Sequence, residues 1–168
     1  MGVSRGLAGV TVVLVALICS SNGGADGGAQ RARLVGGQAC HGRVIVGVLP
    51  SWARSGFRDP NRRMPYVVGR SKAIAGILWG HPLTSPPPKN RNNKILWVSH
   101  RPPTTGSDLR IRAQRMSGSE AVGRPVTRTV SGGPGPSIIN LPSAGCWRLN
   151  LSWSGRIDTV DLRYIARR

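Results

Sequence analysis

The stretch SAGCWRLNLSWSGRIDTVDLRY, residues 143–164, decides the fold. From Trp147 to Trp153, tryptophan and leucine alternate with arginine, asparagine and serine. A period of two is typical of a strand with one buried face. The same alternation places Cys146 on the polar side, although unpaired cysteine is among the most buried residue types. The position of Cys146 therefore indicates a bonding partner.

A second strand follows this one directly. If Ser154 and Gly155 form a two-residue hairpin turn, the register is set by counting outward from the turn. The resulting pairs are Trp153 with Arg156, Asn150 with Thr159, Leu149 with Val160, Arg148 with Asp161, and Trp147 with Leu162. A slip of one residue would turn every side chain to the wrong face. The sequence thus predicts a β-hairpin in this register.

Other segments extend the same pattern. Apolar or alternating runs predict further strands at residues 43–50, 94–99, 107–116 and 124–130. The run 72–80 is apolar throughout and fits either a buried strand or one short helix. Proline and glycine predict long loops at 51–66 and 81–93. Together these features predict an all-β protein, an antiparallel β-sandwich of immunoglobulin-like type.

The N-terminus is typical of an export signal. Arg5 precedes an apolar run over residues 7–18, which is followed by small residues. Two outcomes stay open for Cys19: removal with a cleaved signal, or acylation as the anchoring cysteine of a lipoprotein. Ile18 stands where bacterial lipoprotein signals carry Gly, Ala or Ser. The protein is expected to be secreted, or lipid-anchored at the outer face of the cytoplasmic membrane.

The chain divides into three expected parts. Residues 1–21 are the signal segment, residues 22–39 are a flexible linker rich in Gly, Ala and Arg, and residues 40–168 are the β-sandwich domain. The domain keeps two cysteines, Cys40 and Cys146. In an oxidising compartment we expect these to form a disulfide, the alternative being two free thiols.

Most of the chain after the linker resembles a family. The segments RDPNRRMPYVVGRSKAIAGILWGHPL, NNKILWVS and GPSIINLPSAGCWRLNLSWSGRIDTVDLRY resemble uncharacterised exported or lipoprotein-like proteins of high-GC actinobacteria. The Pro-x-x-Gly-Cys-Trp element at residues 142–147 is similar to the final hairpin of other bacterial secreted β-sandwich modules. The resemblance implies an exported β domain and implies no activity.

The charge balance is strongly basic. There are 24 Lys and Arg against 6 Asp and Glu, a formal net charge of +18. Such a charge attracts phosphates, acidic polymers and anionic lipid surfaces. The excess of Arg over Lys equally fits codon usage in a GC-rich genome.

Sequence patterns for catalysis and metal binding are missing. The three histidines, His41, His81 and His100, are widely spaced and have no carboxylate pair beside them. There is no Gly-x-Ser-x-Gly nucleophile motif, no Walker phosphate loop and no positioned pair of carboxylates. We therefore expect no catalytic residue, no metal and no cofactor.

What remains is a binding surface. Arginines on and beside the strand 107–116 predict a basic strip for anions, comprising Arg110, Arg112, Arg115, Arg124 and Arg128. Trp79, Trp97 and Trp147 are expected in the core, whereas Trp52 and Trp153 are the candidates for an exposed stacking surface.

Three functions follow in order of preference. The first is a non-enzymatic envelope protein that binds an anionic polymer, a lipid headgroup or a protein partner. The second is an extracellular nucleic-acid-binding module, and the third is a hydrolase of unknown type.

Overall fold

The computed structural model describes residue 40 and residues 42–167. The expected signal segment, the linker and Cys19 lie outside these residues. Within the described part of the chain, no helix has the length and hydropathy that crossing a membrane requires.

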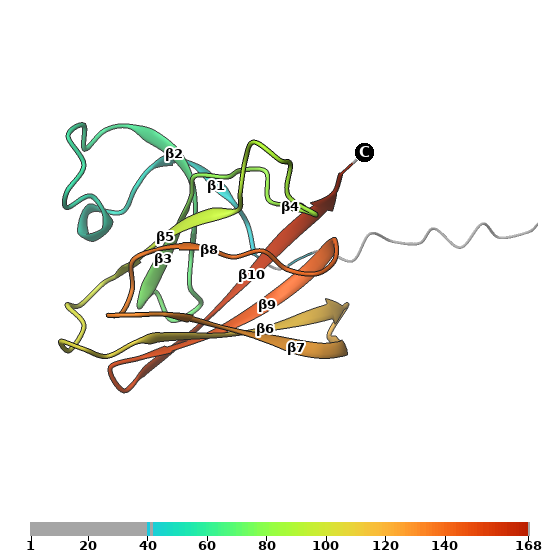
Figure 1. Cartoon of the computed structure of the whole chain (residues 1–168). Helices are drawn as coiled ribbons and strands as arrows, with labels where there is room; N and C mark the ends of the chain where they lie inside the picture. The colour runs from blue at the N-terminus through green and yellow to red at the C-terminus, as the bar shows by residue number, and fades with distance from the viewer. Residues whose placement is uncertain (1–39, 41, 168) are drawn as a thin grey trace, which may run out of the picture. The chain divides into compact units, whose positions relative to one another are not determined.

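Ten strands form two sheets that face each other (Figure 1). The first sheet has the order β1 (Ile45–Val48), β2 (Arg63–Val68), β3 (Ile74–Leu78), β5 (Lys94–Ser99) and β8 (Pro136–Ile138). The second has the order β4 (Thr84–Ser85), β10 (Arg156–Ala166), β9 (Gly145–Trp153), β6 (Leu109–Ser117) and β7 (Glu120–Val130). All described strand pairs are antiparallel except β10 with β4. The predicted β-sandwich is confirmed.

The β9–β10 hairpin has the predicted register throughout. Trp153 pairs with Arg156, and the pairing runs outward as far as Tyr164 with Gly145. Both turn residues have positive φ, 46° at Ser154 and 69° at Gly155. Positive φ at both positions defines the turn whose twist matches that of a hairpin.

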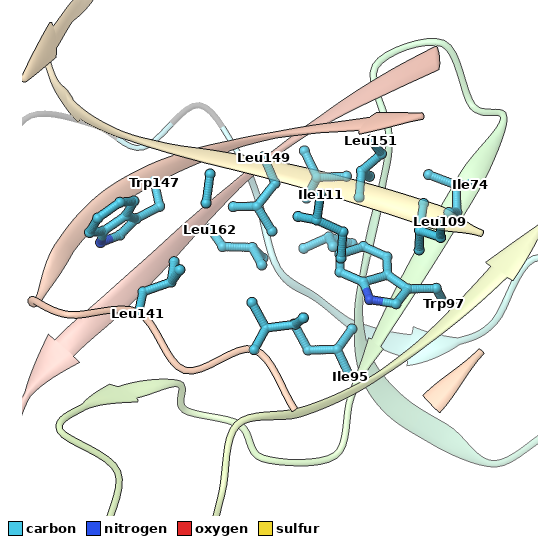
Figure 2. Packing of buried hydrophobic residues seen from close by; sticks show 14 of the residues in the cluster. Ile74, Ile95, Trp97, Leu109, Ile111, Leu141, Trp147, Leu149, Leu151 and Leu162 are labelled. Atoms are coloured by element: carbon cyan, nitrogen blue, oxygen red, sulfur yellow. The ribbon is translucent and has the colours of Figure 1, made fainter. Parts of the chain in front are cut away.

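The main core lies between the two sheets (Figure 2). Its centre holds side chains from both, including Ile95 and Trp97 of the first sheet and Ile111, Trp147 and Leu149 of the second. Trp97 and Trp147 are buried, as predicted.

A second cluster covers the other face of the first sheet. It combines side chains of β2 and β3 with Ala53 of a short 3-10 helix, Ser51–Ala53. Trp52 and Phe57 pack against it from the loop. β3 is therefore buried on both faces, which explains why its sequence shows no alternation.

Four details differ from the sequence-based expectations. β2 begins inside the predicted loop 51–66. It tolerates Pro65 because this residue pairs with β1 but not with β3, whose pairing with β2 begins at Tyr66. The predicted loop 81–93 contributes the two-residue edge strand β4. Trp79 is 47% exposed rather than in the core, whereas Trp153 is only 2% exposed. The Trp153 indole donates to Ser99 Oγ at 3.0 Å.

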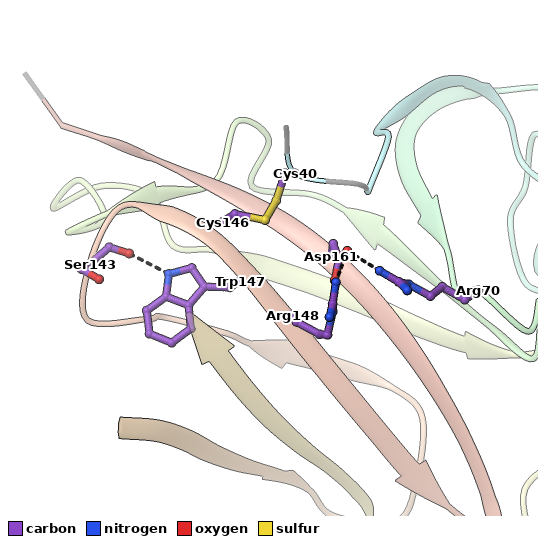
Figure 3. Close-up of a disulfide and its surroundings, with 7 residues drawn as sticks. All are labelled: Cys40, Arg70, Ser143, Cys146, Trp147, Arg148 and Asp161. Carbon is purple, nitrogen blue, oxygen red and sulfur yellow. Dashed lines mark hydrogen bonds and ion pairs between the residues drawn. A yellow bond between two sulfur atoms is a disulfide. The ribbon is translucent and has the colours of Figure 1, made fainter. Parts of the chain in front are cut away.

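The disulfide is the expected one. Cys40 and Cys146 are bonded, with their Cα atoms 5.4 Å apart (Figure 3). The bond joins the segment before β1 to β9, so it does not link the two sheets as an immunoglobulin disulfide does. Cys146 lies on the polar side of β9 because its partner comes from a segment outside the sheet.

Candidate functional site

We call the side of the second sheet that faces away from the first sheet the outer face. On β6, Leu109, Ile111 and Ala113 are fully buried in the core. Arg110 and Arg112 alternate with them and are exposed on the outer face. Their Cα atoms are roughly 7 Å apart along the strand. Both arginines therefore face outward together, and their role in anion binding stays a prediction.

Short polar side chains lie beside these arginines. Ser152 of β9 pairs with Arg110, and Asn150 pairs with Arg112. On the next strand, Thr159 donates from Oγ1 to Asn150 Oδ1 at 3.1 Å, and Ile157 is 78% exposed. Because Asn150 and Ser152 are shorter than the arginines of β6 and than Ile157, the surface is lower over this part of β9.

The result is a hollow of about 640 Å³ on the outer face. Its polar and charged lining residues are Arg70, Ser71, Arg110, Arg112, Thr127, Asn150, Ser152, Asp158 and Thr159. We call this feature the arginine hollow.

The far wall of the arginine hollow comes from the turn between β2 and β3. Asp158 of β10 holds this turn: its Oδ1 accepts from the Ser71 N–H at 2.9 Å, and its Oδ2 accepts from the N–H groups of Ala73 at 2.9 Å and Ile74 at 3.3 Å. The N–H of Thr159 also donates to Asp158 Oδ1, at 2.7 Å. Both carboxylate oxygens are thus occupied by backbone donors.

Arg70 projects from this turn and is held by a second carboxylate. Its Nη2 lies 2.8 Å from Asp161 Oδ2, and Arg148 donates from Nε to Asp161 Oδ1 at 2.9 Å (Figure 3). Burial acts to raise the pKa of Asp161, but the hydrogen bonds from Arg148 and Arg70 outweigh it and lower the pKa. The Asp161 side chain is 2% exposed, whereas that of Arg70 is 55% exposed. Arg70 is therefore fixed at one end of its guanidinium and open to solvent.

Few negative charges oppose these arginines. The described acidic residues are Asp59, Asp108, Glu120, Asp158 and Asp161. Asp158 lines the hollow, but its oxygens face backbone N–H groups. Asp108 lies outside the lining and accepts from the Gly132 N–H at 3.0 Å. The arginine hollow therefore presents a positive surface.

The other predicted anion-binding residues do not join it. Arg115 is exposed, but it pairs with Trp147, so by register it projects from the opposite side of the sheet to Arg112. Arg128 pairs with Ile111 and donates to the Asn140 carbonyl at 3.2 Å. Arg124 is exposed in a stretch where the pairing of β6 with β7 shifts register. Of the five predicted residues, Arg110 and Arg112 line the hollow, and Arg115, Arg124 and Arg128 do not.

Sequence reasoning missed Arg70. Nothing in the local pattern around residue 70 marks it, because its position depends on hydrogen bonds to residues about 90 positions away on β10. The sequence signal for such a contact was the pair Asp158 and Asp161. Two acidic residues on one strand of a basic chain indicate that basic side chains or N–H groups from elsewhere in the fold bind them.

Within the described residues, no group of three or more His, Cys, Asp or Glu side chains is arranged to hold a metal ion. Comparisons with protein-family models, curated proteins and solved structures find no match for this chain. The arginine hollow is thus interpreted from its own geometry.

Proposed function

We propose that this chain is a non-enzymatic β-sandwich protein of the cell envelope that binds an anionic envelope component in the arginine hollow. The observation that carries the proposal is the grouping of Arg70, Arg110 and Arg112 around one hollow whose only lining carboxylate, Asp158, is occupied by backbone donors. Guanidinium groups bind phosphates and carboxylates through paired hydrogen bonds.

The chemistry of the hollow supports binding rather than catalysis. General acid–base catalysis requires a titratable group that is free to reach the substrate. In the hollow the titratable groups are three arginines and Asp158, and arginine stays protonated in proteins. Asp158 already accepts four backbone N–H groups. These residues are therefore suited to binding an anion rather than to transferring a proton.

The location in the envelope has two supports. The Cys40–Cys146 disulfide is the kind of bond that persists in oxidising compartments. The apolar run at residues 7–18, preceded by Arg5, is typical of an export signal. Export would place the arginine hollow among the anionic polymers and lipid headgroups of the envelope.

Salt elution from an anionic matrix tests the binding face. Arg110→Ala with Arg112→Ala should elute at a clearly lower salt concentration than the wild type, because two contacts to the bound anion are lost. The matched control is Lys89→Ala with Arg124→Ala, which removes the same charge from exposed positions outside the hollow.

The comparison between the two double variants decides the outcome. If they elute together, only net charge governs retention and the arginine hollow is not a binding site.

A further inference from the structure

We infer that the ligand of the arginine hollow is a strand of an acidic, hydroxyl-rich polysaccharide. This inference rests on the proposed function, and it adds the chemical class of the ligand. It follows from three features of the hollow: its two charged walls, its polar floor and the composition of its lining.

The charged walls fit an extended ligand. Arg110 and Arg112 stand on β6, whereas Arg70 stands on the β2–β3 turn, which is bound to β10, the second strand from β6. Neighbouring strands are about 4.8 Å apart, so β6 and β10 are separated by roughly 10 Å at the backbone. A polymer that carries repeated acidic groups can contact both walls.

The floor offers hydrogen-bond acceptors as well as donors. Asn150 and Ser152 are exposed there, and no hydrogen bond among the described residues engages the Asn150 Nδ2 amide or the Ser152 hydroxyl. On β7, the hydroxyl of Thr127 also lines the hollow and makes no hydrogen bond among the described residues. Hydroxyl groups donate and accept, and amide groups do so with their nitrogen and oxygen. Sugar hydroxyls can bind both the donors and the acceptors of such a floor. A bare phosphate or carboxylate can bind only the donors of the floor.

The lining also separates this class from nucleic acid. Proteins that bind single-stranded nucleic acid stack its bases on aromatic side chains. The lining of the arginine hollow contains no aromatic residue, and its exposed apolar side chain is the aliphatic Ile157. The exposed Trp79 lies directly after β3, in the other sheet. An aliphatic side chain can contact the C–H surface of a sugar ring but provides no surface for base stacking.

The test uses the full chain with polygalacturonate fragments as the acidic polysaccharide and oligothymidylate as the nucleic acid. Asn150→Leu with Ser152→Val removes the polar groups of the floor and leaves the charge unchanged. We expect this variant to bind polygalacturonate about tenfold more weakly, as the loss of two or three hydrogen bonds implies. Its binding to oligothymidylate should change less than twofold.

Asn90→Leu with Thr105→Val is the control, since both residues are exposed and outside the lining. If the floor variant matches this control while Arg110→Ala with Arg112→Ala loses binding, charge alone holds the ligand. The inference then fails and the proposed function stands. If neither variant differs from its own control, the proposed function fails as well.

A third result would replace the ligand class. If the wild type prefers oligothymidylate at equal salt and the floor variant loses that binding too, the ligand is a nucleic acid and the inference is wrong.

Discussion

At the scale of single residues, Asp161 joins two elements that are far apart in sequence. It binds Arg148 on the neighbouring strand and Arg70 on the β2–β3 turn. The Arg148 pair was predicted from the hairpin register, because opposite charges face each other there. The Arg70 pair was not, since only the folded sandwich brings the turn to the edge of β10.

Asp161→Asn should lower the free energy of unfolding by about 2 kcal/mol at pH 7, because hydrogen bonds to an ionised carboxylate are stronger than those to an amide. The pKa of Asp161 is lowered in the folded state, so its stabilising effect is present above the unfolded pKa and is lost as the pH falls. Urea unfolding of both proteins between pH 7 and pH 2 measures this difference.

The difference in the free energy of unfolding between the wild type and Asp161→Asn should decrease from about pH 5 downward. Glu120→Gln, at an exposed residue, is the control and should unfold like the wild type. A difference that stays constant with pH would show that the Asp161 carboxylate is not the ionised partner described here.

At the scale of elements, the β9–β10 hairpin is the best-determined part of the sandwich. Its turn needs two residues with positive φ, and Gly155 adopts this conformation with no strain. A Cβ on Gly155 would meet nothing within 4 Å, so any cost of adding one is conformational.

Gly155→Ala should therefore destabilise the protein by about 1 kcal/mol, measured by urea unfolding. Gly47→Ala in β1 is the matched control. A Cβ there makes one ordinary contact, 3.6 Å from Ile45 Cγ2, and glycine weakens a strand relative to alanine. Equal unfolding midpoints for the two variants would contradict the turn geometry.

The elements also show how far sequence reasoning reaches. The hairpin register and the outward direction of Arg110 and Arg112 follow from a period of two, which one-sided strands display. β3 is buried on both faces, and the sequence left its conformation undecided. Arg115 does not line the hollow, because the alternation that places Arg112 on the outer face places Arg115 on the other side of the sheet, beside Trp147.

At the scale of the whole molecule, the disulfide and the placement of charge matter most. The bond between Cys40 and Cys146 spans 106 residues of sequence. On the chain-entropy model, closing a loop of this length stabilises the folded state by about 4–5 kcal/mol. The disulfide therefore contributes a large share of the stability expected for a domain of this size.

Peptide mapping without reductant tests the bond in protein recovered from its native compartment. We expect the peptides that contain Cys40 and Cys146 to be recovered as one linked species. Recovery of both as separate alkylated peptides would contradict the disulfide and remove its support for export.

The net charge of +18 alone does not distinguish codon usage from ligand binding. The placement of the arginines supports the proposal of ligand binding, because three of them surround one hollow whose lining carboxylate, Asp158, is occupied by backbone N–H groups. Elsewhere, Trp79 stacks near Phe57 with ring centroids 6.3 Å apart, beside Arg58 and Arg62, and forms the main alternative surface.

The central claim is that an anionic ligand binds in the arginine hollow. Amide chemical shifts recorded by NMR during titration of the isotope-labelled full chain with polygalacturonate fragments test it most directly. The account predicts that the largest changes fall on Ser71, Thr127, Asn150 and Ser152. Changes centred on Phe57 and Trp79, or spread evenly over the basic surface, would contradict it.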